Sequence, residues 1–401
     1  MDRFNLFLFL WNIIKMKNKK PFNELKNRVL FLGLFFFFAF HLKGQNTYDF
    51  DGQILVQSNL GLKKGTTKFI GLRYLPEFTY RKKIDSLQSF TFEVAGNLSS
   101  SRYSMPNIPN ELKTSLDPYR IWARYLNKNF EIRLGLQKID FGSAQLLRPL
   151  QWFNQIDPRD PLSLTNGVYG LLVRYHYKNN SNIWLWGLYG NDKLRGLDAL
   201  PTTVKTPEFG GRYQSFIPRG ELAISYHYRT ANSEDGLGIQ TYSKNPEHRI
   251  GFDSKWDLGI GLWIESTFIH REKDLGLFTN QFLLNLGTDY TFNLGNGLNI
   301  AAEHLLSSLI SKDFDDSTKQ HISALRLSYP LTFYSSINGL LYQQWKNNQQ
   351  TLLLNYEHQF KYFSAYLIVY YNPEETQGIQ QNEIVTSLKG PGIQLLVTYN
   401  H

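Results

Sequence analysis

The alternation of apolar and polar residues with a period of two is the feature that most constrains this chain. After Gln45 it recurs about every twenty residues, and no stretch keeps a helical period for long. In "SFTFEVAGNLS", for example, Phe92 and Val94 alternate with Thr91 and Glu93. Because successive side chains of a strand point to opposite faces, the pattern predicts an all-β protein whose strands each have one apolar and one polar face.

The connections between these strands are of two kinds. Short clusters of Asn, Asp and Gly, which favour tight hairpins, are "LNKN" at Leu126, "KNNS" at Lys178, "DLG" at Asp257 and "NLGNG" at Asn293. Long connections are predicted over Ser99 to Pro118, Ile139 to Gly167, Asn191 to Pro218 and Asn372 to Ser387. When the N-terminus is placed in the periplasm, every long connection falls on the outer side.

About eighteen strands are predicted, with the first beginning at Gln53. The number falls to about sixteen if the weak segments Leu237 to Lys244 and Ile337 to Trp345 are not strands. An even count, short turns on one side and long loops on the other are typical of a transmembrane antiparallel up-and-down β-barrel of a bacterial outer membrane. A soluble sandwich or propeller also alternates, but it explains neither the loop asymmetry nor the N-terminus.

The N-terminus resembles an export signal. Lys and Arg residues precede "VLFLGLFFFFAF", Val29 to Phe40, which is shorter than the roughly 20 residues that span a bilayer. We therefore expect residues 1–44 to be a signal peptide, with Met16 as the start, and residues 45–401 to be one barrel without a separate plug domain. The expected location is the outer membrane of a Gram-negative cell, reached through the periplasm.

Net charge and cysteine content narrow the function further. The formal charge of +9 falls to +3 when the eight Lys/Arg and two Asp/Glu of residues 1–44 are removed, so a nucleic-acid partner has little support. The absence of Cys excludes disulfides, thiolate metal sites and Cys nucleophiles.

The polar parity predicts the lining of the lumen, which is aqueous at this strand number unless something fills it. Bases gather on consecutive strands and acids on later ones, so the wall is expected to carry a basic arc (Arg120, Arg124, Arg133, Arg174) and an acidic arc (Glu265, Asp289, Glu303, Glu357). Such arcs produce a transverse field. The alternative is that these charges pair with neighbours on adjacent strands.

The connection "KIDFGSAQLLRPLQWFNQIDPRDPLSLTNG" is the strongest candidate site. It is longer than ordinary hairpin loops, and its apolar residues would be costly in water, so we expect Ile139 to Gly167 to fold inward as a constriction. The apolar residues concerned are Leu146, Leu147, Leu150, Trp152, Phe153 and Ile156. The residues predicted to face the aperture are Arg148, Asp157, Arg159 and Asp160 from the loop, and Arg120, Arg124, Arg133, Gln137 and Arg174 from the wall.

The segment "RLGLQKIDFGSAQLLRPLQWFNQIDPRDPL" resembles a stretch of outer-membrane porins of the alginate-export-like and related solute-porin families. The matching residues are Arg133, Gly135, Gln137, Ile139, Phe141 and Gly142 in the strand and Asp157, Pro158 and Asp160 at the loop end. Leu136 stands where the families usually have a second Arg, and the missing Arg weakens any preference for polyanions. Asp157 replaces the Asn of the families. The resemblance implies an eighteen-stranded passive channel.

Other functions find less support in the sequence. The His residues are scattered, and neither H-E-x-x-H nor G-x-S-x-G occurs, so a barrel hydrolase is the weaker alternative. Asp157 and Asp160 could ligate Ca²⁺, but a turn with a salt bridge to Arg148 or Arg159 is the more common arrangement. A non-conducting barrel that serves as a scaffold in a surface or secretion assembly stays open.

The sequence thus predicts a porin for passive diffusion of small hydrophilic or charged solutes. It is expected to be no enzyme and to hold no cofactor or metal. Its expected partners are those solutes and outer-membrane lipids, with self-association left open.

Overall fold

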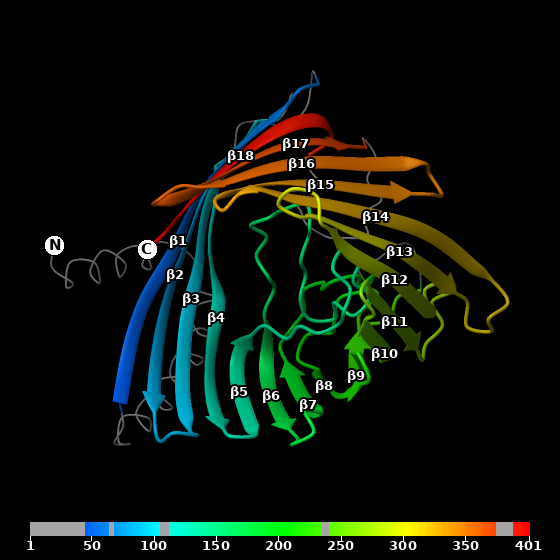
Figure 1. Cartoon of the computed structure of the whole chain (residues 1–401). Coiled ribbons are helices and arrows are strands. Elements are labelled where there is room, and N and C mark those ends of the chain that lie inside the picture. Colours follow the sequence, from blue (N-terminus) through cyan, green and yellow to red (C-terminus); the bar gives the residue numbers. More distant parts are fainter. Residues whose placement is uncertain (1–44, 64–67, 105–111, 235–239, 374–387) are drawn as a thin grey trace.

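The computed structural model describes residues 45–63, 68–104, 112–234, 240–373 and 388–401 (Figure 1). The expected signal peptide, 1–44, lies outside the described residues. Within these ranges no helix is long and apolar enough to cross a membrane.

Eighteen strands form a single sheet. The first nine are β1 Gln45–Gly61, β2 Lys68–Lys83, β3 Ser89–Ser104, β4 Leu112–Asn127, β5 Phe130–Gln137, β6 Val168–His176, β7 Asn182–Tyr189, β8 Pro207–Ile217 and β9 Gly220–Ala231. The last nine are β10 Asn245–Asp257, β11 Gly261–Arg271, β12 Asn280–Phe292, β13 Leu298–Ile310, β14 Ser317–Thr332, β15 Ser335–Gln344, β16 Gln349–Gln359, β17 Phe363–Asn372 and β18 Gly390–Asn400.

Each strand pairs antiparallel with its neighbours in the chain, and β18 pairs with β1 from Gln53↔Asn400 to Gly61↔Gly392, which closes the barrel. The predicted closed, up-and-down, eighteen-stranded barrel is therefore confirmed. Closure gives every strand a hydrogen-bonded neighbour on both sides, as a lipid environment requires, although the arm 45–51 of β1 pairs with β2 alone.

The connections differ between the two ends of the barrel. One end has only short turns, including the four that the sequence predicts, whereas the other carries the long connections 138–167 and 190–206. The prediction of loop over Asn191 to Pro218 is wrong at its end, because β8 begins at Pro207; Gly210 and Gly211 interrupt the apolar parity there. Most of Ser99 to Pro118 likewise belongs to long polar arms of β3 and β4.

Of the two weak candidate strands, one is a strand in the structure and the other is not. Ile337 to Trp345 largely coincides with β15, but residues 240–244, the described part of Leu237 to Lys244, are not a strand. The correct strand number therefore includes one strand that the sequence missed and omits one weak candidate. The barrel also begins at Gln45, earlier than the predicted Gln53. Most of Asn372 to Ser387 lies outside the described residues.

The two faces of the sheet have opposite polarity. Side chains on the outer parity are apolar and exposed, as at Val56 (46%), Ile224 (56%) and Leu354 (52%). On the inner parity, polar side chains such as His227 and Arg229 are fully buried. This inversion relative to a soluble barrel confirms the alternation read from the sequence.

Candidate functional site: the segment inside the barrel

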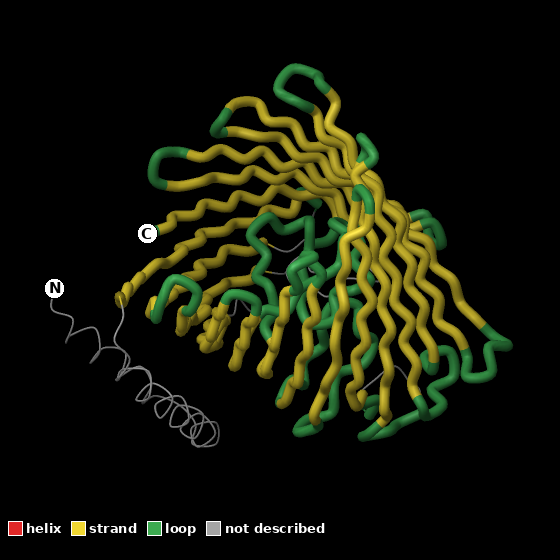
Figure 2. The backbone as a smooth tube through the Cα atoms, turned by 60° about the horizontal axis from the view of Figure 1, so that its bottom comes forward, coloured by secondary structure: helices red, strands yellow, loops and turns green. Residues whose placement is uncertain are grey.

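Residues 138–167, the inner segment, leave the end of β5 and turn into the space that the strands enclose (Figures 1 and 2). Gly135 prepares this turn at the end of β5: its φ is +124°, and a Cβ there would lie 2.1 Å from the carbonyl oxygen of Ile121. No other residue fits this position. Gln137, the last residue of β5, donates to the carbonyls of Arg133 in β5 (3.1 Å) and Gly170 in β6 (2.9 Å), so it joins the two strands between which the segment is inserted.

The apolar part of the segment packs on the inner wall in two clusters. Phe141, Trp152 and Phe153 pack with Trp186 of β7, while Leu146 and Leu147 pack with residues of β12 to β15. The predicted burial is confirmed for Leu146, Leu147, Leu150, Trp152 and Phe153, each at most 4% exposed, and Ile156 is half-buried. The segment therefore reaches from β7 to β15 across the interior.

Two wall carboxylates bind the backbone of the segment. Glu265 of β11 accepts the N–H groups of Ala144 (2.9 Å) and Leu150 (2.6 Å). Glu303 of β13 accepts those of Gln145 (2.6 Å), Leu146 (3.1 Å) and Leu147 (2.6 Å). Both Glu residues are at most 3% exposed. The expectation that they form an acidic arc facing the lumen is wrong, because the segment covers them.

The charges of the segment pair among themselves. Asp157 and Arg159 form a bidentate ion pair with Nη2 to Oδ2 at 2.7 Å, and Arg148 pairs with Asp140 at 2.7 Å. The prediction that Asp157 faces the aperture is wrong: it is fully buried, since the guanidinium covers it. Asp160 accepts the N–H of Leu162 at 2.9 Å and closes a turn.

The pKa values of two segment residues reflect these pairs. Burial alone would raise the pKa of Asp140, but Arg148 and Lys138 lower it more, so the carboxyl titrates below its usual range. Burial would lower the pKa of Arg159, and Asp157 raises it above its usual value. The Asp140 carboxylate and the Arg159 guanidinium therefore stay ionised at neutral pH.

The end of the segment crosses to the opposite wall. Leu162 packs beside Leu55 of β1, and its carbonyl accepts from Arg73 of β2 at 2.9 Å. Arg120 of β4 binds the carbonyl of Thr165 at 2.9 Å. Arg120 and Gln137, which the sequence assigned to the pore lining, are only 7% and 0% exposed. Arg120 binds the segment instead, and Gln137 binds the backbone of β5 and β6.

Three of the predicted lining residues do lie together. Arg124, Arg133 and Arg174 come from β4, β5 and β6. Arg124 lies opposite Arg133 in the β4–β5 register, and Arg174 lies opposite Glu131 in the β5–β6 register. Glu131 pairs with Arg133 (2.7 Å) and Arg174 (3.7 Å), so the group carries two net positive charges. Arg174 also lies over the Trp184 ring at 3.8 Å. These guanidinium groups keep partial exposure, 16% for Arg133 and 19% for Arg174.

A second interior segment, 190–206, is anchored by a buried ion network that the sequence analysis did not find. Arg229 of β9 binds Glu247 of β10 (2.6 Å) and Asp198 of the segment (2.9 Å). Arg249 and Arg271 also bind Glu247. All five side chains are at most 4% exposed. In the sequence, the alternation that puts Arg229 and Arg249 on the polar parity of their strands is the signal of this network.

The two segments touch each other. A Cβ on Gly196, whose φ is +53°, would lie 1.8 Å from the carbonyl oxygen of Gln151. Only glycine allows this approach. The interior is therefore filled by two mutually packed segments along part of its circumference, next to the basic group on β4 to β6.

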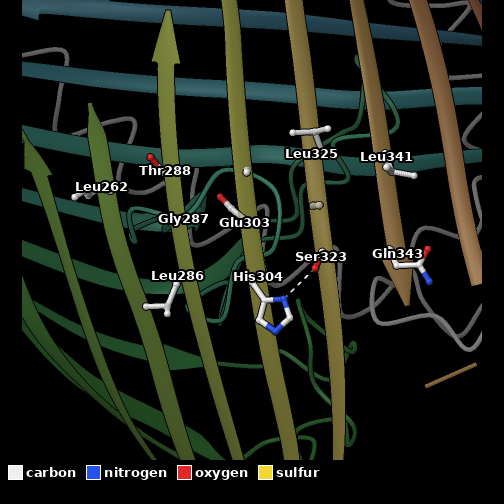
Figure 3. A pocket seen from close by; sticks show the side chains of 12 residues that line it. Leu262, Leu286, Gly287, Thr288, Glu303, His304, Ser323, Leu325, Leu341 and Gln343 are labelled. Atoms are coloured by element: carbon white, nitrogen blue, oxygen red, sulfur yellow. Dashed lines mark hydrogen bonds between the residues drawn. The ribbon is translucent and has the colours of Figure 1, made fainter. Parts of the chain in front are cut away.

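The outer wall carries a shallow groove of about 530 Å³ over β11 to β15 (Figure 3). Its lining is mainly apolar, but His304 Nδ1 lies 2.9 Å from Ser323 Oγ, its register partner, and His304 Nε2 lies 3.1 Å from His321. Trp345 donates to Ser323 at 2.9 Å. No group of three or more His, Cys, Asp or Glu side chains that could hold a metal ion occurs within the described ranges. The carboxylate of Asp157, a possible Ca²⁺ ligand in the sequence, forms an ion pair with Arg159.

Comparisons with known proteins agree with the fold. No family model and no curated protein matches the chain. Among solved structures, the in vitro folded outer-membrane protein OmpT of Vibrio cholerae, in a trimer form, has a TM-score of 0.50 at 9% identity, over 89% of this chain and 99% of that chain. Salmonella typhi OmpF in complex with daunomycin has a TM-score of 0.48 at 9% identity, over 89% and 98%.

The chain thus has the fold of the outer-membrane β-barrels. At 9% identity the likeness to the Vibrio cholerae barrel concerns the fold alone. The resemblance to alginate-export-like and solute-porin families stays a prediction, since no family model matches.

Proposed function

We propose that this protein is a porin of a Gram-negative outer membrane that lets small hydrophilic or charged solutes diffuse passively. The supporting observation is the inverted polarity of the sheet, with exposed Val56 and Leu354 outside and the partly exposed Arg133 and Arg174 inside. An apolar belt fits lipid, and a charged inner wall fits water. Surrounding lipids are then the only obligatory partner, and no cofactor is needed.

The inner segment would narrow the channel, and the wall would supply its selectivity. Arg148, Asp157 and Arg159 are neutralised within the segment, so they contribute little net field. The group of Arg124, Arg133 and Arg174 retains net positive charge beside the segment. The proposal therefore moves the selective residues from the constriction loop to the basic group of the wall.

Planar-bilayer recording of refolded residues 45–401 tests this proposal. Steady ohmic steps are expected, with a reversal potential in a salt gradient that indicates a preference for anions. Arg124→Ala should reduce that preference, because it removes a positive charge from the basic group. The change leaves no acid without its ion-pair partner, since the only polar contact of Arg124 in the described strands is with Thr91 at 3.4 Å. Lys128→Ala, at an exposed turn, is the matched control. A folded barrel that never conducts would contradict the porin and favour the scaffold.

The groove on the outer wall supports a second candidate, a hydrolase that acts on lipid esters. Ser323 Oγ lies within hydrogen-bond distance of His304, a nucleophile and base in contact beside an apolar groove. No carboxylate orients this histidine in the described contacts; His321 takes that place. Labelling with a fluorophosphonate that disappears in Ser323→Ala would support the enzyme, and no labelling would remove it.

A further inference from the structure

Over residues 144–150, the backbone hydrogen bonds between the inner segment and the barrel wall converge on two carboxylates. Together Glu265 and Glu303 accept five backbone N–H groups from residues 144–150. Every residue except Pro has a backbone N–H, so these bonds fix the backbone position of residues 144–150 and do not depend on which side chains stand there. Arg326 of β14 adds one side-chain contact, to Gln145 at 2.8 Å.

Glu265 depends on the segment for its hydrogen-bond donors, whereas Glu303 also accepts from two wall side chains, Trp263 of β11 at 3.1 Å and Asn285 of β12 at 3.0 Å. The ion pairs of the described strands engage other acids, such as Glu131, Asp253 and Glu247, and not Glu265 or Glu303. A buried carboxylate without a cation is costly unless several N–H groups bind it. If the segment left the wall, Glu265 would lose both of its hydrogen-bond donors from the segment. Segment and carboxylates therefore stabilise each other.

We propose that Glu265 and Glu303 are positioning residues that fix the inner segment against β11 and β13 and thereby set the open area of the channel. This inference rests on the proposed porin function. Neither residue needs to contact a solute. Each acts through the backbone it holds, so its loss should let the segment move into the remaining path or away from the wall.

The geometry at Gly142 agrees with a close, specific approach. A Cβ on Gly142 would lie 2.5 Å from Oε2 of Glu265, and the residue has a φ of +104°. The segment therefore enters the wall contact at a residue without a side chain. Any larger residue here would push against the carboxylate that holds the next turn of the chain.

Thiol accessibility tests the contact without depending on conduction. The chain has no Cys, so Leu146→Cys introduces a single reporter at a fully buried position. Glu265→Gln keeps the shape but replaces one acceptor with an NH₂ group that faces an N–H donor. We expect a water-soluble maleimide to label Cys-substituted Leu146 about tenfold faster or more in the Glu265→Gln background, since each charge-assisted bond lost changes the open population by about that factor.

The matched control is Glu221→Gln on β9, whose carboxylate accepts from Gln214 on the neighbouring strand at 2.7 Å. It should leave the labelling rate unchanged. Equal labelling rates in the Glu265→Gln and Glu221→Gln backgrounds would overturn the proposal. If Glu265→Gln does not fold, Glu265→Asp, which keeps the charge but shortens its reach, gives the same comparison.

Single-channel recording supplies the functional measurement. Glu265→Gln and Glu303→Gln should change the mean conductance and increase current fluctuations, whereas Glu221→Gln should not. Unchanged conductance and noise in both variants would contradict the positioning role. If the unmodified barrel never conducts, the porin function fails, and the labelling comparison still decides whether the carboxylates hold the segment.

Discussion

At the scale of single residues, the charges of the inner segment have partners that the sequence could not assign. The turn with a salt bridge, named as the common arrangement for Asp157, is the one observed, with Arg159 as partner. The pair of Arg148 with Asp140, eight residues earlier, depends on how the segment folds back on itself. Side-chain type was therefore predictable, but pairing required the three-dimensional path.

The pair of Asp140 with Arg148 makes a pH-dependent contribution to stability. Because the pKa of Asp140 is lowered in the folded chain, the ionised carboxylate stabilises the fold above its ordinary pKa, and this is lost as pH falls through the lower folded value. Asp140→Asn should lower the free energy of unfolding by about 1–2 kcal/mol at pH 7. The difference should persist at pH 5 and shrink below about pH 3.8.

The measurement is the urea midpoint of the folded barrel for both chains at several pH values. Asp313→Asn, at an exposed loop position, is the control and should show no difference. Identical midpoints for Asp140→Asn and the unmodified chain at pH 7 would mean that the pair contributes nothing.

At the scale of elements, the segment 190–206 is joined to β9, β10 and β11 through one buried network. Arg229 binds two acids from different elements, and Glu247 binds three guanidinium groups. Alternation along β9 and β10 puts Arg229 and Arg249 on the polar parity of their strands. It could not show that Asp198, in a loop without period, would reach them. Long-range ion pairs leave no local pattern.

Removal of Arg229 should therefore affect the whole element. Arg229→Ala leaves Glu247 and Asp198 with fewer donors inside the barrel, and breaking a buried pair in this way typically costs about 3–5 kcal/mol. Equilibrium unfolding should show this loss, together with earlier protease cleavage within 190–206. Arg219→Ala, exposed in the turn between β8 and β9, should change neither. A loss under about 1 kcal/mol would show that the remaining arginines compensate.

At the scale of the whole molecule, the sequence predicted the strand number, the connectivity and the two faces, because alternation and turn residues are local and repeat in every hairpin. It also predicted that residues 139–167 fold inward, but it could not predict which wall residues this segment covers. The inner segment is located by contacts with β2, β4, β11 and β13, which are far apart in the chain. The sequence therefore predicted a transverse field between a basic and an acidic arc that both face the lumen. In the structure the segment covers Glu265 and Glu303 of the acidic arc.

The opposed faces of the sheet lead to a prediction for neighbouring residues of one strand. Val56 of β1 is 46% exposed on the outer parity, and Gln57 lies half-buried on the inner parity. In lipid, Val56→Arg should lower the free energy of unfolding by about 2–4 kcal/mol, because a charge near the middle of the bilayer is costly. Gln57→Arg should cost much less, since its side chain faces the lumen. Unfolding of both variants in the same lipid vesicles compares them directly, and an equal cost at the two positions would contradict a lipid-facing outer wall.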